Sequence, residues 1–186
     1  ALTDMGEYKK AFESYSKLLE KYNDPEILVN RAILATAHLK DHKLAIKDFE
    51  KVYTSDFASF SKATQSLFAV HYASALQHSK QYTRAEEMFR IALEQSPTKQ
   101  VVLGFMKNTY NQSQRWKKFI GFLKDQTVRD PGEATYFAMI GEVQIQELQK
   151  FEDAVSSYAD AIAIEPNRSD FYTNLGLAFY RQGDIE

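Results

Sequence analysis

The histidines are the residues of this sequence whose type and spacing come nearest to chemistry. His38 and His42 stand four residues apart, but a predicted turn separates them and the zinc-binding pattern HExxH is absent. His71 and His78 share one predicted helix face, yet no matched carboxylate accompanies them. We therefore interpret the histidines as packed or exposed residues, and we predict no metal site.

The acidic pairs also have a structural explanation. Glu86-Glu87 and Glu152-Asp153 fall in predicted first turns of helices, where acidic side chains interact favourably with the helix dipole. The chain has no Cys, no glycine-rich phosphate-binding loop and no Gly-x-Ser-x-Gly motif. The sequence therefore predicts no catalysis and no cofactor.

The composition is that of a folded, helix-rich protein. Of the 186 residues 44% are hydrophobic and 26% are charged, with seven Gly and four Pro. No apolar run approaches the roughly 18 to 20 residues that cross a bilayer, so we expect no membrane insertion. The first residues, ALTDMGEYKK, lack the apolar segment of a signal peptide, and the absence of Cys does not choose between cytoplasm and periplasm.

Charge is distributed unevenly along the chain. Residues 1–130 hold 20 Lys and Arg against 15 Asp and Glu, a balance of +5, whereas residues 131–186 hold 3 against 10, a balance of −7. One interpretation is two solvated faces, and the other is steering of a charged partner or head-to-tail association of copies. The basic segment RWKK at 115–118 does not predict nucleic-acid binding, because the whole chain carries a net charge of −2.

Small residues recur with a period near 34. Ala11, Ala45, Ala85 and Ala154 are separated by 34, 40 and 69 residues, and Phe119 stands at the intermediate mark. A ring precedes each mark by three residues, and a large apolar residue follows it by four. The rings are Tyr8, His42, Tyr82, Trp116 and Phe151, and the large residues are Tyr15, Phe49, Phe89, Leu123 and Tyr158. This spacing predicts one buried helix face in each of five copies.

Prolines separate the copies. Pro97, Pro131 and Pro166 follow three of the marks by twelve residues, and a second amphipathic segment precedes each marked helix. The predicted unit is therefore helix, short turn, helix. We predict a single array: a second helix at 1–22, then pairs at 25–55, 60–96, 98–130 and 133–166, and the first helix of a truncated repeat at 168–186.

This pattern resembles the tetratricopeptide (TPR) repeat. The residues that carry the resemblance are Leu175-Gly176, Phe179 and Gly183-Asp184 in the last copy, with Ala154, Tyr158, Ala161 and Pro166 in the copy before. The resemblance implies an all-α fold, an α-solenoid with a right-handed superhelix and about ten helices, in which neighbouring repeats stack. Because the array begins and ends inside repeats, we expect a fragment of a longer chain.

Two copies depart from the pattern. The 40-residue step carries six extra residues around 52–65, which predicts a longer connection or an extra helical turn. The pair at 98–130 has Lys107 and Phe119 where the family has small residues at the helix crossing, and Gln126 further along the same helix face. We expect its two helices to pack less closely than the others.

The resemblance places a peptide groove on the first helix of each pair. The groove positions are Asn30, Ser74, Gln77, His78, Asn108, Asn111, Gln112, Glu142, Gln146, Thr173 and Arg181. The lysine, asparagine and arginine set with which chaperone-binding members hold a terminal carboxylate is absent. Amide side chains pair instead with the backbone of an extended segment, so we expect a protein or peptide partner.

The main hypothesis is a non-catalytic scaffold or adaptor that binds an extended peptide or a partner helix. One alternative is a structural subunit that self-associates through its ends. Another is the substrate-recruiting arm of an enzyme whose catalytic domain lies outside this segment. The sequence does not identify the partner, the compartment or the oligomeric state.

Overall fold

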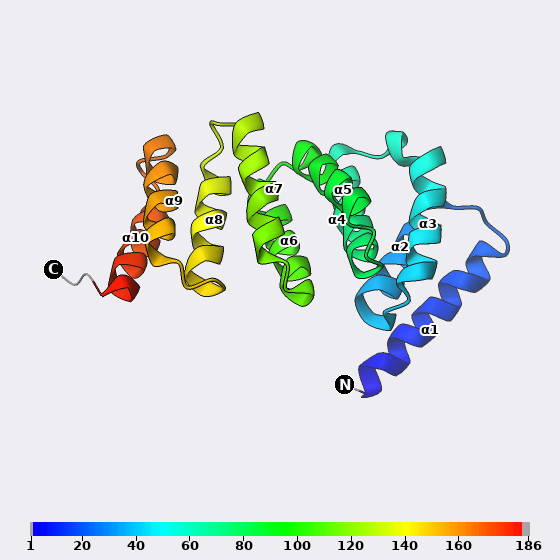
Figure 1. Cartoon of the computed structure of the whole chain (residues 1–186). Helices are drawn as coiled ribbons and strands as arrows, with labels where there is room; N and C mark the ends of the chain where they lie inside the picture. Colours follow the sequence, from blue (N-terminus) through cyan, green and yellow to red (C-terminus); the bar gives the residue numbers. More distant parts are fainter. Residues whose placement is uncertain (1, 184–186) are drawn as a thin grey trace. The chain divides into compact units, whose positions relative to one another are not determined.

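The chain folds as paired helices. The computed structural model describes the backbone of residues 2–183 and the side chains from residue 6 onward, and the part described contains ten α-helices and no strand. None of these helices has the length and apolar character that a membrane span requires. The α-helices are α1 (Leu2–Leu19), α2 (Pro25–Leu34), α3 (His42–Ser55), α4 (Lys62–His78), α5 (Tyr82–Gln95), α6 (Lys99–Ser113), α7 (Trp116–Arg129), α8 (Ala134–Gln146), α9 (Phe151–Ile164) and α10 (Ser169–Gln182) (Figure 1).

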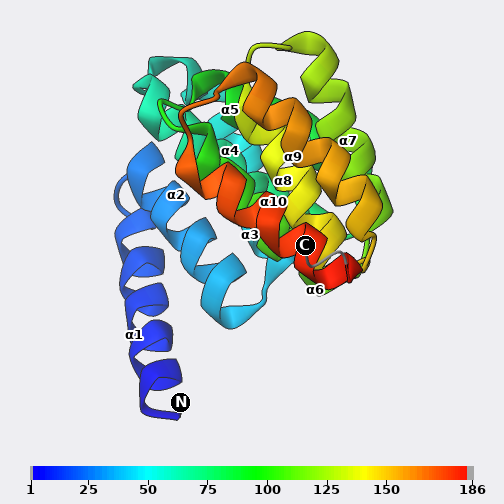
Figure 2. The same cartoon turned by 90° about the vertical axis from the view of Figure 1, so that its left-hand side faces the viewer.

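The chain divides into two compact units, with the boundary inside α6. Residues 1–109 form the first unit, in which α2 packs on α3 and α4 on α5. Figure 2 shows α1 and α2 of this unit side by side. Residues 110–186 form the second unit, in which α8 packs on both α7 and α9, and α9 packs on α10. The expected all-α fold with about ten helices is confirmed.

Side chains fix several of the helix starts. The carboxylate of Asp24 accepts a hydrogen bond from the N–H of Glu26 at 2.8 Å, and Pro25 occupies the first turn. The Asp41 carboxylate and the Ser61 hydroxyl cap α3 and α4 in the same way. Each cap satisfies an N–H that has no partner within the helix.

A left-handed residue ends the first helix of every pair. Four of these residues are not glycine: Lys40, Lys80, Gln114 and Gln149 have φ between 53° and 61°, and the fifth is Gly183 with φ 91°. Each of the four stands two residues before the second helix of its pair. This conformation reverses the chain and satisfies carbonyls at the helix end.

The turns differ by one residue. After α4 and α6, the N–H that follows the left-handed residue donates to a carbonyl five residues back: Gln81 to Leu76 (2.9 Å) and Arg115 to Tyr110 (3.2 Å). After α2 and α8 the span is six residues: Asp41 to Ala35 (3.0 Å) and Lys150 to Gln144 (2.8 Å). In the α2 pair the additional residue is absorbed by a π-helix at Ala35–Leu39.

Three of the four alanine marks lie in the core, whereas Ala11 on α1 is half-buried. Ala45, Ala85 and Ala154 are fully buried, and so are the large residues four positions later. Ala32, Ala73 and Gly141 are buried on the first helices of the same pairs. A small residue on each helix therefore permits the close approach that the period predicts.

The extra residues at 52–65 form a lengthened connection. A 3₁₀-helix at Phe57–Ser59 lies between α3 and α4, and the Gln65 amide donates to the carbonyl oxygens of Phe57 (3.2 Å) and Phe60 (3.0 Å). The Phe57 ring lies 5.1 Å from the ring of Phe68, which is fully buried. These ring contacts hold the connection against α4.

The mark that carries a large residue is also a packing position. Phe119 on α7 is fully buried and stacks on the buried ring of Tyr110, with centroids 4.8 Å apart and an interplanar angle of 18°. Gln126 is 6% exposed, and its amide donates to the carboxylate of Asp125 at 3.1 Å. Phe119 thus places an aromatic ring, stacked on Tyr110, where the other marks have alanine.

Candidate functional site

The predicted groove residues of the first unit differ in exposure. Asn30 on α2 and Asn108 on α6 are exposed, and Ser74 and His78 on α4 are half-buried. Gln77 is only 4% exposed, so it presents almost no surface to a ligand. In the first unit, the predicted groove residues that expose polar atoms are therefore Asn30, Ser74, His78 and Asn108.

The register of α2 places Asn30 differently from its counterparts. Asn30 on α2 and Val70 on α4 are counterparts by count, because each stands fifteen residues before the alanine mark of its pair. Val70 stands three residues before the buried Ala73 on its own helix, whereas Asn30 stands two residues before the buried Ala32. The reason is that the turn after α2 contains one residue more than the turn after α4. A count made backwards from the second helix therefore falls one residue too close to the C-terminal end of α2. The position equivalent to Val70 is therefore Val29, and Asn30 is one residue, about 100°, further round α2.

Three exposed amides follow one another along α6. Asn108, Asn111 and Gln112 are spaced by three and one residues, so they share one face of a continuous helix. The side-chain oxygen of Asn111 accepts a hydrogen bond from the amide of Gln114 at 3.3 Å. Ser74, Gln77 and His78 on α4 have the same spacing, but only on α6 are all three predicted residues exposed.

The remaining predicted residues belong to the second unit. On α8, Gln146 is exposed and Glu142 is half-buried. On α10, Thr173 and Arg181 are both exposed, and the Thr173 hydroxyl donates to the carbonyl of Ser169 at 3.0 Å. That these residues contact a ligand stays a prediction.

An apolar hollow lies beside the predicted polar residues of the first unit, and the sequence reasoning missed it. This α4–α6 hollow has a volume of about 230 Å³ and is lined by Ala63, Ser66, Leu67, Val70, Ser96, Pro97, Thr98, Val101, Val102 and Phe105. Leu67 is 48% exposed, Val101 57% and Phe105 41%. Their positions were a usable signal, since Leu67 and Val101 stand seven residues before the predicted groove positions Ser74 and Asn108, on the same helix face.

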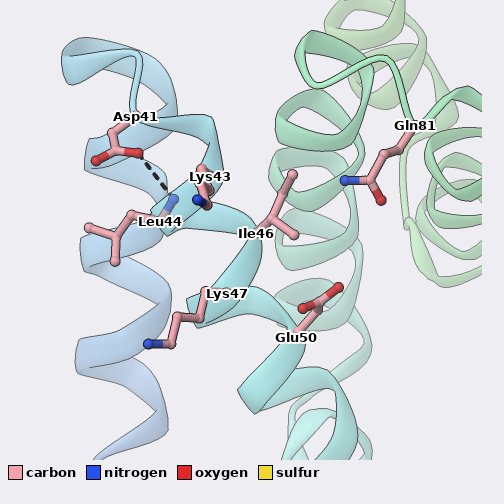
Figure 3. A pocket seen from close by; sticks show the side chains of 7 residues that line it. All are labelled: Asp41, Lys43, Leu44, Ile46, Lys47, Glu50 and Gln81. Atoms are coloured by element: carbon pink, nitrogen blue, oxygen red, sulfur yellow. Dashed lines mark hydrogen bonds between the residues drawn. The ribbon is translucent and has the colours of Figure 1, made fainter.

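A second hollow, of about 500 Å³, lies beside the second helix of a pair. It is lined by Asp41, Lys43, Leu44, Ile46, Lys47, Glu50 and Gln81 (Figure 3). The Asp41 carboxylate accepts from the N–H of Leu44, and Glu50 accepts from Arg84 at 2.7 Å. Its two lysines are balanced by two carboxylates, so we do not assign it to either an anionic or a cationic ligand.

The histidines are packed against other rings. His42 at the start of α3 stacks on His78 at the end of α4, with centroids 4.5 Å apart, and His38 stacks on Tyr8 at 3.7 Å. His71 meets the ring of Phe105 edge-on at 5.7 Å. Among the described residues, no three His, Asp, Glu or Cys side chains are grouped in a way that would hold a metal ion.

Burial lowers the pKa of three of these imidazoles. It lowers the pKa of His42, which His78 and Lys40 depress further and Asp41 partly restores. It lowers the pKa of His78, to which Lys40 adds, and burial alone lowers the pKa of His71. Nδ1 of His42 is buried without a hydrogen-bond partner, so a charged ring would leave an N–H unsatisfied.

These pKa shifts predict acid sensitivity near neutral pH. An unfolded histidine titrates near 6.5, so the unfolded chain binds protons first as the pH falls. We expect the free energy of unfolding to be insensitive to these groups above about pH 7.5 and to decrease as the pH falls below about 6.5, the pKa of an unfolded histidine. Denaturation by urea at several pH values measures this, and the double substitution His42→Gln/His78→Gln should flatten the profile. An equally steep profile in that variant would contradict the assignment.

Comparisons with known proteins agree with this architecture. The family model of a TPR repeat matches residues 147–183. The structure of the C-terminal part of a TPR repeat-containing protein from Cytophaga hutchinsonii is 22% identical, with 95% of this chain and 67% of that chain covered and a TM-score of 0.59. The MamA RS-1 double mutant is 19% identical, with 89% of each chain covered and a TM-score of 0.52. No curated protein matches the chain.

The chain thus contains a tetratricopeptide repeat and has the fold of solved TPR structures. A repeat of that family is matched directly at residues 147–183, and the helix pairs of the whole chain have the same fold as solved TPR structures. The resemblance carried by Ala154, Tyr158 and Leu175-Gly176 is confirmed. At these sequence identities the likeness to the solved structures is one of fold.

Proposed function

We propose that this chain is a protein-interaction module that holds an extended peptide against the first helices of its repeats. The observation that carries the proposal is the row Asn108, Asn111 and Gln112, three exposed amides on one face of α6. An amide both donates and accepts, so a row of amides matches the alternating N–H and C=O groups of an extended backbone. Binding of this kind requires no catalytic group.

The charge of the two central first helices supports the same proposal. Neither α4 nor α6 contains an Asp or Glu, so no carboxylate on these helices competes with a ligand for their polar groups. Repeat proteins of this class present extended surfaces of stacked helices, which suit a linear segment better than a compact ligand.

A displayed library of random linear peptides provides the test. The most enriched peptide, synthesised with a fluorescein label, should bind the wild-type chain and lose about tenfold in affinity in the variant Asn108→Ala/Asn111→Ala. The expected loss corresponds to about 1.4 kcal/mol, the net value of one or two hydrogen bonds to the peptide backbone. Fluorescence anisotropy measures the affinity.

The matched control is Asn167→Ala, an exposed asparagine in the turn between α9 and α10. It should leave the affinity unchanged, and all three proteins should have the same far-ultraviolet circular dichroism. If the double variant binds the enriched peptide as tightly as the wild type, the amide row is not the binding surface. If no peptide is enriched, the proposed function itself is wrong.

A further inference from the structure

The start of α3 contacts the end of α4 through two stacked histidine rings. His42 is the first residue of α3 and His78 the last residue of α4, and their ring centroids lie 4.5 Å apart with an interplanar angle of 18°. Both side chains are half-buried. Because α3 packs in one pair with α2 and α4 in the next pair with α5, this stack joins two neighbouring helix pairs of the first unit.

The same contact occurs one helix pair earlier with a different ring. Tyr8 on α1 stacks on His38, with centroids 3.7 Å apart. Tyr8 and His42 each stand three residues before an alanine mark, whereas His38 and His78 each stand seven residues before the next mark. The stacking position is therefore repeated along the chain. At its second occurrence both rings are imidazoles, the side chains that gain charge closest to neutral pH.

Positive charge is unfavourable at the His42–His78 stack. Burial lowers the pKa of both imidazoles, and Lys40 in the turn before α3 lowers both further. His78 also lowers the pKa of His42, which the Asp41 carboxylate raises in part. That carboxylate already accepts the N–H of Leu44 at 3.1 Å, and Nδ1 of His42 is buried without a hydrogen-bond partner. A proton on His42 would therefore leave a buried charge beside Lys40 and an unsatisfied N–H.

A second contact between α3 and α4 does not depend on protons. Phe49 in the middle of α3 meets the ring of Phe68 edge-on at 5.2 Å and stacks on Tyr72 at 5.3 Å, and all three residues are buried. Neither phenylalanine has a titratable group, and burial raises the pKa of Tyr72 to about 12. The middle of the α3–α4 interface is therefore insensitive to mild acid, whereas its end at the histidine stack is not.

We propose that the His42–His78 stack is a pH-sensitive contact between two helix pairs, closed at neutral pH and opened in mild acid by protonation of both rings. In the open form the two charged rings separate from each other and from Lys40, and water solvates them. The inference goes beyond the proposed function and does not depend on it. It affects the predicted groove, because Asn30 on α2 and Ser74 on α4 belong to the two pairs that the stack joins.

Nuclear magnetic resonance tests the inference by measuring the two contacts separately. The nuclear Overhauser effect between ring protons of His42 and His78 should lose about half its intensity or more between about pH 7.5 and about pH 5.5. A solvated imidazole with a pKa of about 6.5 raises the opening constant by up to about tenfold at the lower pH, so two imidazoles make an open form of about 1% as populated as the closed form. The effect between Phe49 and Phe68 is the matched control and should keep its intensity.

The variant His42→Phe identifies the paired imidazoles as the cause. It keeps a ring against His78, and a cation is attracted to the face of a phenyl ring, so the contact should persist in mild acid. The Phe49–Phe68 effect also reports whether this variant is folded. An undiminished histidine contact in the wild type would overturn the inference, and so would an equal loss in His42→Phe. Joint loss of the Phe49–Phe68 contact would overturn it as well, because the whole unit would then be unfolding.

Discussion

Replacing Arg31 by Met should destabilise the first unit by about 3 kcal/mol. The Arg31 guanidinium on α2 forms a two-pronged ion pair with Asp48 on α3, in which Nε and one terminal nitrogen each lie 2.8 Å from a carboxylate oxygen. The side chains are 16% and 5% exposed. Removing one partner of a buried ion pair leaves the other charge unpaired, which costs about 3 to 5 kcal/mol.

Arg31 also connects α1 to the pair. A terminal nitrogen donates to the hydroxyl of Ser16 at 3.3 Å, and the guanidinium lies 5.9 Å from the ring centre of Phe12. Because Met retains the length and the apolar character of the side chain, most of the loss in Arg31→Met should come from Asp48. The double variant Arg31→Met/Asp48→Leu should therefore recover most of the stability, since no buried charge remains.

Urea denaturation followed by circular dichroism measures both variants. The control is Arg129→Met, which removes an exposed partner of Asp125 on α7 and should cost less than about 1 kcal/mol. A loss in Arg31→Met as small as that of the control would contradict the prediction. So would a double variant no more stable than the single one, because the cost would then lie in lost packing.

The helix pairs were predictable because their signals are local and repeated. A small residue such as Ala85 with a large one four positions later identifies a buried helix face wherever it occurs, and Pro97 separates one pair from the next. The same count predicted a longer connection at 52–65, which the structure has. It did not predict that Gln65 and the nearby phenylalanine rings hold that connection against α4. Those contacts depend on how the folded connection packs on the helix, which residue spacing does not show.

The details of the site were less predictable, for two physical reasons. A fixed period assumes one residue count per turn, whereas the π-helix at 35–39 adds a residue and rotates α2 by about 100°, which moves Asn30 relative to its counterparts. Exposure was also not readable from the pattern. Gln77 is polar yet buried, and Val101 is apolar yet more than half exposed, because neighbouring helices decide what is covered.

Substitution by alanine should have opposite effects at Gly141 on α8 and at Gly176 on α10. The free energy of unfolding should decrease in the first variant and increase in the second. Ile140-Gly141 on α8 and Leu175-Gly176 on α10 are the same pattern in sequence. A Cβ on Gly141 would lie 2.7 Å and 2.8 Å from two ring carbons of Tyr158, whereas a Cβ on Gly176 would meet nothing within 4 Å.

Gly141→Ala should therefore destabilise the second unit, by up to about 2 kcal/mol. Tyr158 is 1% exposed and belongs to the cluster that contains Ala154 and Phe171, so its ring has little room to move away. Overpacking of this kind typically costs 1 to 3 kcal/mol, and the higher helix propensity of Ala returns about 1 kcal/mol. Gly176→Ala gains the propensity without a clash and should stabilise the same unit by about 0.5 to 1 kcal/mol.

A double variant identifies the ring as the cause. Gly141→Ala/Tyr158→Leu should lose less stability than the sum of its two single variants, because the smaller side chain relieves the contact that Ala creates. Thermal and urea unfolding of the four proteins measure the coupling. Equal and positive effects of Ala at both glycines would show that helix propensity alone governs them. Opposite effects would establish that the Tyr158 ring holds α8 and α9 at a separation that only glycine permits, and that the sequence pattern by itself does not reveal which glycine is indispensable.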